Sequence, residues 1–372
     1  MKKEWLVLTG TVIVTIMLAI VLLRFFAPQL LGIPIDLQMV QVHKEIVPFY
    51  ENIFRKEDYQ SKEFMLQDPY TNIRAKPLFN NLFGIEGPTD ILGFRNRFVP
   101  NIADIVVLGD SQTYGVNAVL EENWPSQLVH YLKKKDPTLY NMSTGGWGAV
   151  QYLDMFAKAL LFQPRVVIVA FYTGNDPLES ILMAYNIEHW HSLITDPNVD
   201  ISEISIPQFS GSDTWNVLFK DGIKTSFTPQ LRLASNQNTQ IVSAGYATML
   251  KAAQQISTLA TKENIHIIFT IIPTKELVYA EKIVRDEISP PEDYRTLIFM
   301  EKHNIQELAA KLVHLPNSTY VDLTAPLQQA ALRSVQLYPT NLNGHPLPAG
   351  YSEIAYVLAS IVGQYLPEEP KG

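Results

Sequence analysis

The stretch 105-IVVLGDSQTYG-115 joins an apolar run to a polar turn. Residues 105–108 suit the interior of a sheet, because strands buried on both faces read as continuous apolar runs. In an open parallel sheet, ligands bind beyond the carboxyl ends of the strands. Ser111 follows such an end, so we expect its hydroxyl to face a binding crevice, although Gly, Asp and Ser are also common turn residues. Asp110 is a candidate supporting carboxylate; the alternative is that it only accepts hydrogen bonds from turn amides.

Further apolar runs alternate with segments of helical periodicity along the rest of the chain. This alternation predicts an α/β fold, a three-layer α/β/α sandwich with a mostly parallel five-stranded sheet and right-handed crossovers. Residues 182–240 interrupt the alternation with little clear period, and we expect a lid or a substrate-side insertion there. The four further predicted strands are Leu139–Met142, Val166–Tyr172, Ile265–Ile272 and Tyr320–Leu323.

The composition excludes several classes of site. The chain has 372 residues, 47% of them hydrophobic, which is enough for a sizeable core. It has no cysteine, so disulfides, thiolate metal sites and a cysteine nucleophile are excluded. The net charge is −8, without a long basic run to neutralise phosphates, which argues against nucleic acid as a partner. We predict no cofactor and no metal site.

The N-terminal segment predicts a membrane anchor. Trp5–Leu23 contains no charge and, as a helix rising about 1.5 Å per residue, reaches across most of the ~30 Å bilayer core. No small-residue cleavage site follows, so we expect residues 1–26 to form an uncleaved single-pass anchor. Lys2 and Lys3 favour a cytoplasmic N-terminus and an extracytoplasmic main domain. Residues 27–101 are interpreted as a connecting extension.

Three more polar groups follow strands or precede the last predicted helix. Gly146 offers a backbone amide that a substrate can approach closely, Asn175 offers a side-chain donor, and His345 offers a base. Acyl transfer by serine needs a base for the hydroxyl proton and donors for the oxyanion. The stretches are 141-NMSTGGWG-148, 171-FYTGNDP-177 and 343-NGHPLPAGY-351.

In these three stretches, together with 109-GDSQTYG-115, the chain resembles the SGNH (GDSL-like) hydrolase family. The four blocks of that family contribute Ser, Gly, Asn and His. The stretch 92-LGFR-95 resembles the lead-in of a secreted or membrane-anchored branch of the family, and the resemblance covers roughly residues 68–366. One departure is Thr173, which stands where the family usually has glycine.

The resemblance implies a flavodoxin-like domain over residues 102–367, with Ser111 as nucleophile and His345 as general base. It also implies an oxyanion hole made by the Ser111 and Gly146 amides and the Asn175 side chain.

The sequence leaves open which group orients His345. The family places an Asp two or three residues before the histidine, and this chain has Asn343 there. Asn343, or a backbone carbonyl, can fix the imidazole tautomer without providing a negative charge. Alternatively, Asp322 or Asp176 takes this role in space. The last alternative is a weakened enzyme that only binds its ligand.

The family resemblance and the predicted anchor together indicate a function. We expect a serine esterase that removes O-acyl groups, above all O-acetyl groups, from a carbohydrate or cell-envelope polymer. The alternatives are an O-acyltransferase with the same Ser and His, and a carbohydrate-binding scaffold. Lys275, in 273-PTKELVY-279, is a candidate supporting residue, and this segment resembles one in alginate O-acetyltransferase-type relatives. A water-poor acceptor site built by Lys275 and the 182–240 insertion would favour transfer.

Overall fold

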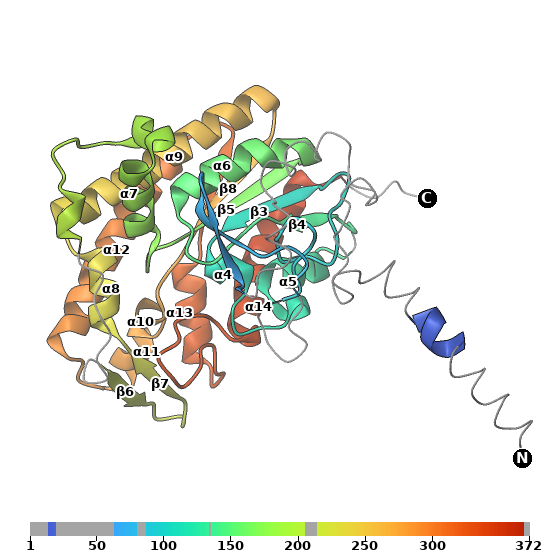
Figure 1. Ribbon diagram of the computed structural model, residues 1–372. Coiled ribbons are helices and arrows are strands. Elements are labelled where there is room, and N and C mark those ends of the chain that lie inside the picture. Colours follow the sequence, from blue (N-terminus) through green and yellow to red (C-terminus); the bar gives the residue numbers. More distant parts are fainter. Residues whose placement is uncertain (1–13, 20–62, 80–86, 134, 205–213, 368–372) are drawn as a thin grey trace, which may run out of the picture.

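The computed structural model in Figure 1 describes most of the chain beyond the N-terminal region. Within the described residues, no helix is long and apolar enough to cross a membrane. The predicted anchor over residues 1–26 lies almost wholly outside them and stays a prediction. The described residues are 14–19, 63–79, 87–133, 135–204 and 214–367.

A parallel five-stranded sheet forms the centre of the protein, in the order β4-β3-β5-β8-β9. The predicted α/β fold with a mostly parallel five-stranded sheet is therefore confirmed. Each crossover returns the chain to the same end of the sheet, so the loops after the strands meet at one edge. The strands are β3 (Ile105–Gly109), β4 (Leu139–Asn141), β5 (Val166–Tyr172), β8 (His266–Ile272) and β9 (Ser318–Asp322).

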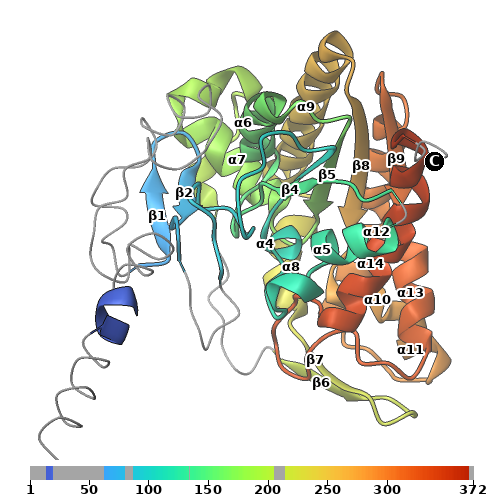
Figure 2. The same cartoon turned by 90° about the vertical axis from the view of Figure 1, so that its right-hand side faces the viewer.

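Helices cover both faces of the sheet, as Figure 2 shows for α6 and α9 on one side and α5 and α14 on the other. Side chains alternate along β5: Val167 and Val169 join one apolar cluster, whereas Val166 and Ile168 join the other. Every residue of β5 is buried, which is why its sequence is continuously apolar. One layer contains α6 (Ala149–Ala159), α7 (Asp176–Asn186), α9 (Gln240–Glu263) and α12 (Glu292–Leu312), and the other contains α5 (Trp124–Tyr131), α13 (Thr324–Leu332) and α14 (Pro348–Val362).

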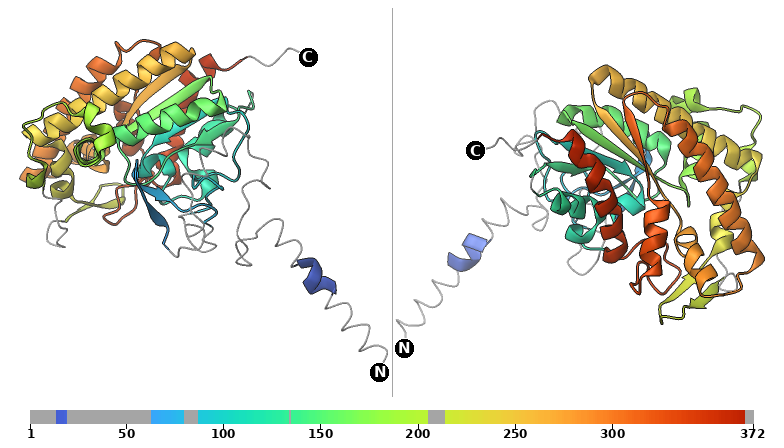
Figure 3. Two further views of the ribbon diagram at one scale, coloured as in Figure 1. Left: turned by 45° about the horizontal axis from the view of Figure 1, so that its top comes forward. Right: turned by 180° about the vertical axis from the view of Figure 1, so that it is seen from behind.

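Shorter helices lie mainly in the connections at the ends of the strands. Figure 3 shows the body from two further sides, with α14 in red. The short α-helices are α4 (Ser111–Tyr114), α8 (Pro229–Asn236), α10 (Lys275–Val278) and α11 (Ala280–Arg285). The 3-10 helices are η3 (Leu120–Glu122), η4 (Leu160–Phe162), η5 (Glu188–Leu193), η6 (Ile201–Glu203) and η8 (Gly363–Tyr365).

Two antiparallel hairpins lie outside the central sheet. The first, β1 (Met65–Asp68) with β2 (Asn72–Ala75), belongs to the segment that the sequence suggested to be a connecting extension. The indole of Trp147 donates a 2.7 Å hydrogen bond to the carbonyl of Ile73, so this hairpin packs onto the domain. The second, β6 (Trp215–Leu218) with β7 (Lys224–Phe227), belongs to the insertion.

Arg95 links the same extension to the helix that begins with Ser111. Its side chain is fully buried, and its guanidinium donates to the carbonyls of Tyr114, Gly115 and Ala118 at 3.1, 2.6 and 2.7 Å. These carbonyls lie at and beyond the C-terminus of α4, where carbonyl groups lack partners within the helix. Arg95 therefore fixes the end of the helix on which the serine stands.

Replacing Arg95 by Met is expected to lower the free energy of unfolding by about 3 kcal/mol or more, because buried carbonyls lose charged donors. Denaturant unfolding measures the change. The control is Arg97→Met, since Arg97 makes an exposed ion pair with Glu121, and such pairs contribute about 0–1 kcal/mol. Equal effects of the two replacements would contradict the role of Arg95.

Candidate active site

Ser111 is held in a rigid turn at the carboxyl end of β3. The carboxylate of Asp110 caps α4 by accepting a 2.9 Å hydrogen bond from the Gln112 amide. Gly115 ends the helix with φ at 91°, and a Cβ there would lie 2.3 Å from Cβ of Asn123, so only glycine fits. The four-residue helix thus has a cap at each end, and the serine stands at its first position.

The structure brings together three of the predicted site residues from opposite ends of the domain. His345 Nε2 lies 2.7 Å from Ser111 Oγ, and His345 Nδ1 lies 2.6 Å from Asn343 Oδ1. All three residues are partly exposed. The predicted nucleophile, base and orienting group are therefore within hydrogen-bonding reach in the order that a serine nucleophile requires.

The amide of Asn343 has a defined orientation. Its Oδ1 also accepts the backbone N–H of His345 at 3.0 Å, which only an oxygen can do. Its Nδ2 donates to Oδ1 of Asn117 at 2.9 Å, while Nδ2 of Asn117 donates to the carbonyl of His345 at 3.0 Å. Asn117 and Asn343 thus form a closed pair around the histidine. Oδ1 of Asn343 can only accept, so Nδ1 of His345 carries the proton and Nε2 is available to accept the serine hydroxyl.

The two carboxylates considered as alternatives lie in other environments. Asp176 is buried and accepts from the Tyr172 amide at 3.0 Å and the Tyr152 hydroxyl at 3.1 Å. Asp322 is exposed and accepts from the Thr324 amide at the start of α13. Nδ1 of His345 therefore donates to the amide oxygen of Asn343 and not to either of these carboxylates.

Burial and neighbouring positive charges determine the protonation of His345. Burial, and then the charges of Arg232 and Lys275, lower the pKa of the imidazole to about 4. At neutral pH the ring is uncharged and can accept a proton. The amide of Asn343 fits this state, because it orients the ring without stabilising the imidazolium as a carboxylate would.

Asp110 lies directly behind the serine. Its Oδ2 is 3.3 Å from Ser111 Oγ, and burial raises the pKa of its carboxyl to about 7. Burial also raises the pKa of Asp176, and the charge of Asp110 raises it further. The two buried acids therefore disfavour each other's ionisation. The capping bond to Gln112 gives Asp110 the structural role that its sequence context suggested.

The loops that carry the other predicted oxyanion donors contact each other beside Ser111. A Cβ at Gly145 would lie 3.6 Å from Cβ of Ser111, and Gly146 has φ at 76°, a conformation that favours glycine. Asn175 Nδ2 lies 3.3 Å from the carbonyl of Trp147. The oxyanion roles of Ser111, Gly146 and Asn175 remain predictions.

Lys275, the first residue of α10, holds the backbone of the loop that carries His345. Its side chain is buried, and its ammonium donates to the carbonyls of Ser226, Asn341 and Asn343 at 2.6, 2.9 and 3.2 Å. An ammonium has three protons, so these three acceptors satisfy it. Lys275 thus joins the β6–β7 hairpin to the loop of His345 and has no remaining proton for a substrate.

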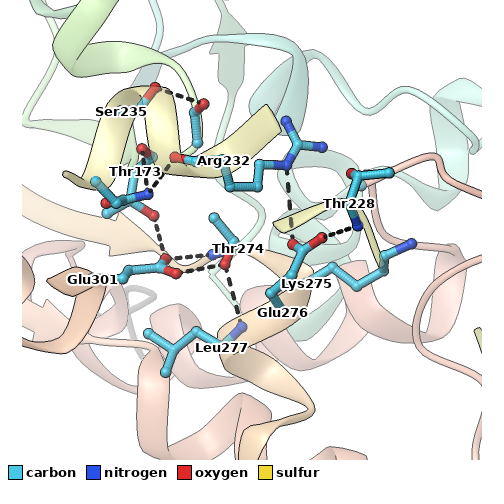
Figure 4. Close-up of polar contacts among 12 residues, drawn as sticks. Thr173, Thr228, Arg232, Ser235, Thr274, Lys275, Glu276, Leu277 and Glu301 are labelled. Atoms are coloured by element: carbon cyan, nitrogen blue, oxygen red, sulfur yellow. Dashed lines mark hydrogen bonds and ion pairs between the residues drawn. The ribbon is translucent and has the colours of Figure 1, made fainter. Parts of the chain in front are cut away.

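A buried carboxylate connects the residues that follow β5 and β8, as Figure 4 shows for Glu301, Thr173 and Thr274. Glu301 accepts from the hydroxyl of Thr173 at 2.5 Å and from the amide and hydroxyl of Thr274 at 2.8 and 2.5 Å. Thr173 is the residue that replaces the usual glycine of the family. Its hydroxyl donates to Glu301 on α12, which also accepts from Thr274. The threonine in place of glycine therefore takes part in the link that Glu301 makes between the ends of β5 and β8.

Sequence reasoning missed three residues around this site: Asn117, Arg232 and Glu301. Asn117 has φ at 73°, and Asn is one of the few non-glycine residues common in that conformation. Its position shortly after the serine block was the only local signal. Arg232 and Glu301 lie in helices α8 and α12, and nothing in their local sequence indicated that Arg232 lies beside the histidine loop or that Glu301 bonds to Thr173 and Thr274.

The tautomer of His345 is expected to depend on Asn117. In wild type at pH 7, long-range proton–nitrogen NMR spectra should show a neutral ring protonated at Nδ1. Asn117→Gly keeps the left-handed backbone accessible but removes the support of Asn343, so the spectra should show exchange between the two tautomers. Asn264→Gly is the control, because Asn264 also has a positive φ, 57°, but is exposed at the C-terminus of α9. A wild-type ring protonated at Nε2 would contradict the assignment.

Comparison with known proteins agrees with this geometry. Residues 107–352, more than half of the chain, match the model of the GDSL-like Lipase/Acylhydrolase family. No curated protein matches the sequence.

Several solved structures are similar at low identity and with TM-scores below 0.5. One is a lipolytic protein of the G-D-S-L family from Desulfitobacterium hafniense, with 15% identity, a TM-score of 0.38, and coverage of 69% of this chain and 98% of the other. A catalytic mutant of an acetylxylan esterase from Geobacillus stearothermophilus has 13% identity, a TM-score of 0.38, and coverage of 73% and 99%. A GDSL-like lipase from Bacteroides thetaiotaomicron has 13% identity, a TM-score of 0.36, and coverage of 70% and 88%.

The four sequence blocks meet at one edge of a parallel sheet, and the family model spans all of them. The chain belongs to the GDSL-like lipase/acylhydrolase family and is an SGNH-type ester hydrolase.

Proposed function

We propose that this protein is a serine esterase that removes O-acyl groups, above all O-acetyl groups, from a carbohydrate or cell-envelope polymer. The observation that carries the catalytic part is the hydrogen-bonded chain from Ser111 through His345 to Asn343. The substrate part is supported by the family together with the uncharged N-terminal segment, which is typical of an anchored extracytoplasmic protein.

In the first half-reaction Ser111 Oγ attacks the ester carbonyl carbon, and its proton passes to Nε2 of His345. The carbonyl oxygen becomes an oxyanion, for which the Ser111 and Gly146 amides and the Asn175 side chain are the proposed donors. Collapse of this intermediate breaks the bond to the alcohol oxygen, which takes the proton from Nε2. Ser111 is then acylated, and the alcohol leaves.

In the second half-reaction water attacks the acyl carbon, and His345 takes its proton at Nε2. Collapse releases the carboxylic acid, and the proton returns to Ser111 Oγ. Oδ1 of Asn343 accepts the hydrogen bond from Nδ1–H throughout, so the ring keeps its orientation when it becomes an imidazolium. Asn343 contributes no negative charge to that imidazolium, so catalysis depends more on the oxyanion donors.

Hydrolysis is favoured over transfer to a sugar hydroxyl by the contacts of Lys275. The ammonium is occupied by three carbonyl groups and therefore offers nothing to an acceptor alcohol. A binding scaffold without activity is disfavoured by the short contact between Ser111 and His345, since an inert serine needs no neutral base at 2.7 Å.

Active-site labelling tests the proposal. A fluorophosphonate probe is expected to label the wild-type protein, and Ser111→Ala should abolish labelling. His345→Ala and Asn343→Ala should each slow labelling about 10² to 10⁴-fold, the range of a general base. Ser143→Ala is the control, because that hydroxyl donates to Asn141 and not to the base. No labelling of folded wild-type protein would contradict the catalytic proposal.

Hydrolysis of 4-nitrophenyl acetate should keep its full rate to low pH. The pKa of His345 is lowered to about 4, so kcat/KM is constant above that pH and falls as pH decreases through about 4, where Nε2 becomes protonated. Asn343→Asp should move this acid limb to higher pH, because a carboxylate stabilises the imidazolium.

The control for this shift is Asn341→Asp, which adds the same charge at an exposed position two residues away. The acid limb of the kcat/KM profile should move less in this variant, since solvent screens the added charge. A wild-type limb near pH 6.5, the ordinary value for histidine, would contradict the effect of burial.

A further inference from the structure

Arg232 of the insertion lies directly against the loop of the catalytic histidine. It belongs to α8, and Gly344 precedes His345 in the chain. A Cβ at Gly344 would lie 2.5 Å from Nη2 and 3.4 Å from Cζ of Arg232, so the glycine makes room for the guanidinium. Because of this proximity, the charge of Arg232 lowers the pKa of His345.

The guanidinium is only weakly engaged by the protein. Within the described residues its one ion pair joins Nε to Oε2 of Glu276 at 3.9 Å, and it makes no hydrogen bond there. A structural Arg–carboxylate pair normally closes to about 2.7–2.9 Å and often forms two parallel bonds. Figure 4 shows the two terminal nitrogens of Arg232 directed away from Glu276. About 20% of the side chain is exposed.

Lys275 shows the contrast between a structural cation and Arg232. Both are positively charged groups near His345, but the ammonium of Lys275 is satisfied by three carbonyls. Arg232 keeps its terminal nitrogens for another acceptor. The hydroxyl of Tyr172 also lies near Gly344, 3.6 Å from the same Cβ position, but it is buried. A planar anion that approaches Gly344 from the solvent would therefore meet the guanidinium of Arg232.

The position next to the histidine indicates which part of a substrate this site would contact. His345 Nε2 gives its proton to the departing alcohol oxygen, so groups near the histidine loop face the alcohol portion of the ester. Buried or half-buried charges are normally paired, and a guanidinium matches the geometry of carboxylate and phosphate. An anionic alcohol portion would complete the pairing of Arg232.

We propose that Arg232 binds a carboxylate or phosphate on the alcohol portion of the substrate, close to the scissile ester. The preferred substrates are then O-acylated anionic sugars, such as uronic acids or sugar phosphates. This inference rests on the proposed esterase function and specifies its substrate class. Arg232 acts as a specificity residue, and the reacting bonds remain those described for Ser111 and His345.

Three acetyl esters with the acetyl group on the same sugar hydroxyl test the inference: those of glucose, glucuronic acid and glucose 6-phosphate. The measurement is kcat/KM at pH 8, where His345 is neutral whether or not Arg232 is present. Wild type should favour at least one anionic ester, and Arg232→Met should lower that rate about 10- to 100-fold, as expected for loss of a charged hydrogen bond. The readout is the ratio of kcat/KM for the anionic ester to kcat/KM for the glucose ester, because an effect of Arg232 on His345 changes both rates and leaves their ratio unchanged.

The matched control is Arg295→Met on α12, whose exposed ion pair with Glu292 lies on the protein surface. Arg232→Lys should restore part of the anionic preference, because it keeps the charge but loses the planar pair of donors. The two anionic esters distinguish carboxylate from phosphate recognition. If Arg232→Met does not fold, wild type alone provides the test. A preference of wild type for an anionic ester over the glucose ester that decreases with added salt supports the inference, and no preference overturns it.

The outcomes separate this inference from the proposed function. Hydrolysis without a preference for either anionic ester would overturn the inference and leave the esterase intact. No hydrolysis of any ester would contradict the esterase. In that case titration of Ser111→Ala with glucuronate, glucose 6-phosphate and glucose would show whether Arg232-dependent anion binding remains. Equal affinity for all three sugars would overturn the inference independently.

Discussion

The contact between Ser111 Oγ and His345 Nε2 joins residues 234 positions apart, and the active-site geometry depends on it. A separation of 2.7 Å requires that the end of β3 and the loop before α14 reach the same place. The parallel sheet makes this possible, because every crossover returns to the same side and all strand ends face one edge. The sheet brings the loops together, and specific polar contacts then fix them.

Those contacts act from several directions. Asn117 holds the amide of Asn343 from the serine side, and Lys275 holds the backbone of the same loop from the end of β8. Arg95 fixes the end of α4, and Glu301 joins the ends of β5 and β8. Each of these groups is charged or an amide, and each is paired with a backbone or side-chain acceptor or donor. Buried polar groups of this kind are costly when unpaired, so together they favour one arrangement of the loops.

The electrostatics of the site follow from the same arrangement. Burial and two nearby positive charges keep His345 neutral, and an amide rather than a carboxylate orients the ring. With Asp in place of Asn343, the imidazolium would be stabilised, and the base would be available only at higher pH. The amide therefore suits a base that has to remain unprotonated. The insertion is part of this balance, since α8 provides one of the two positive charges.

The sequence by itself determined the fold class, the strand positions and the four blocks of the site. Apolar runs report burial on both faces, and Ser111 and His345 stand in short motifs whose order is informative without any distances. Only the tertiary structure decided that Asn343 orients the histidine in place of Asp176 or Asp322. It also showed that the 63–79 segment packs on the domain and that Lys275 is structural.

The sequence could not identify three further residues around the site, Asn117, Arg232 and Glu301. Their roles depend on hydrogen bonds and charges between distant segments, and a local pattern does not record which distant partner a polar side chain will meet.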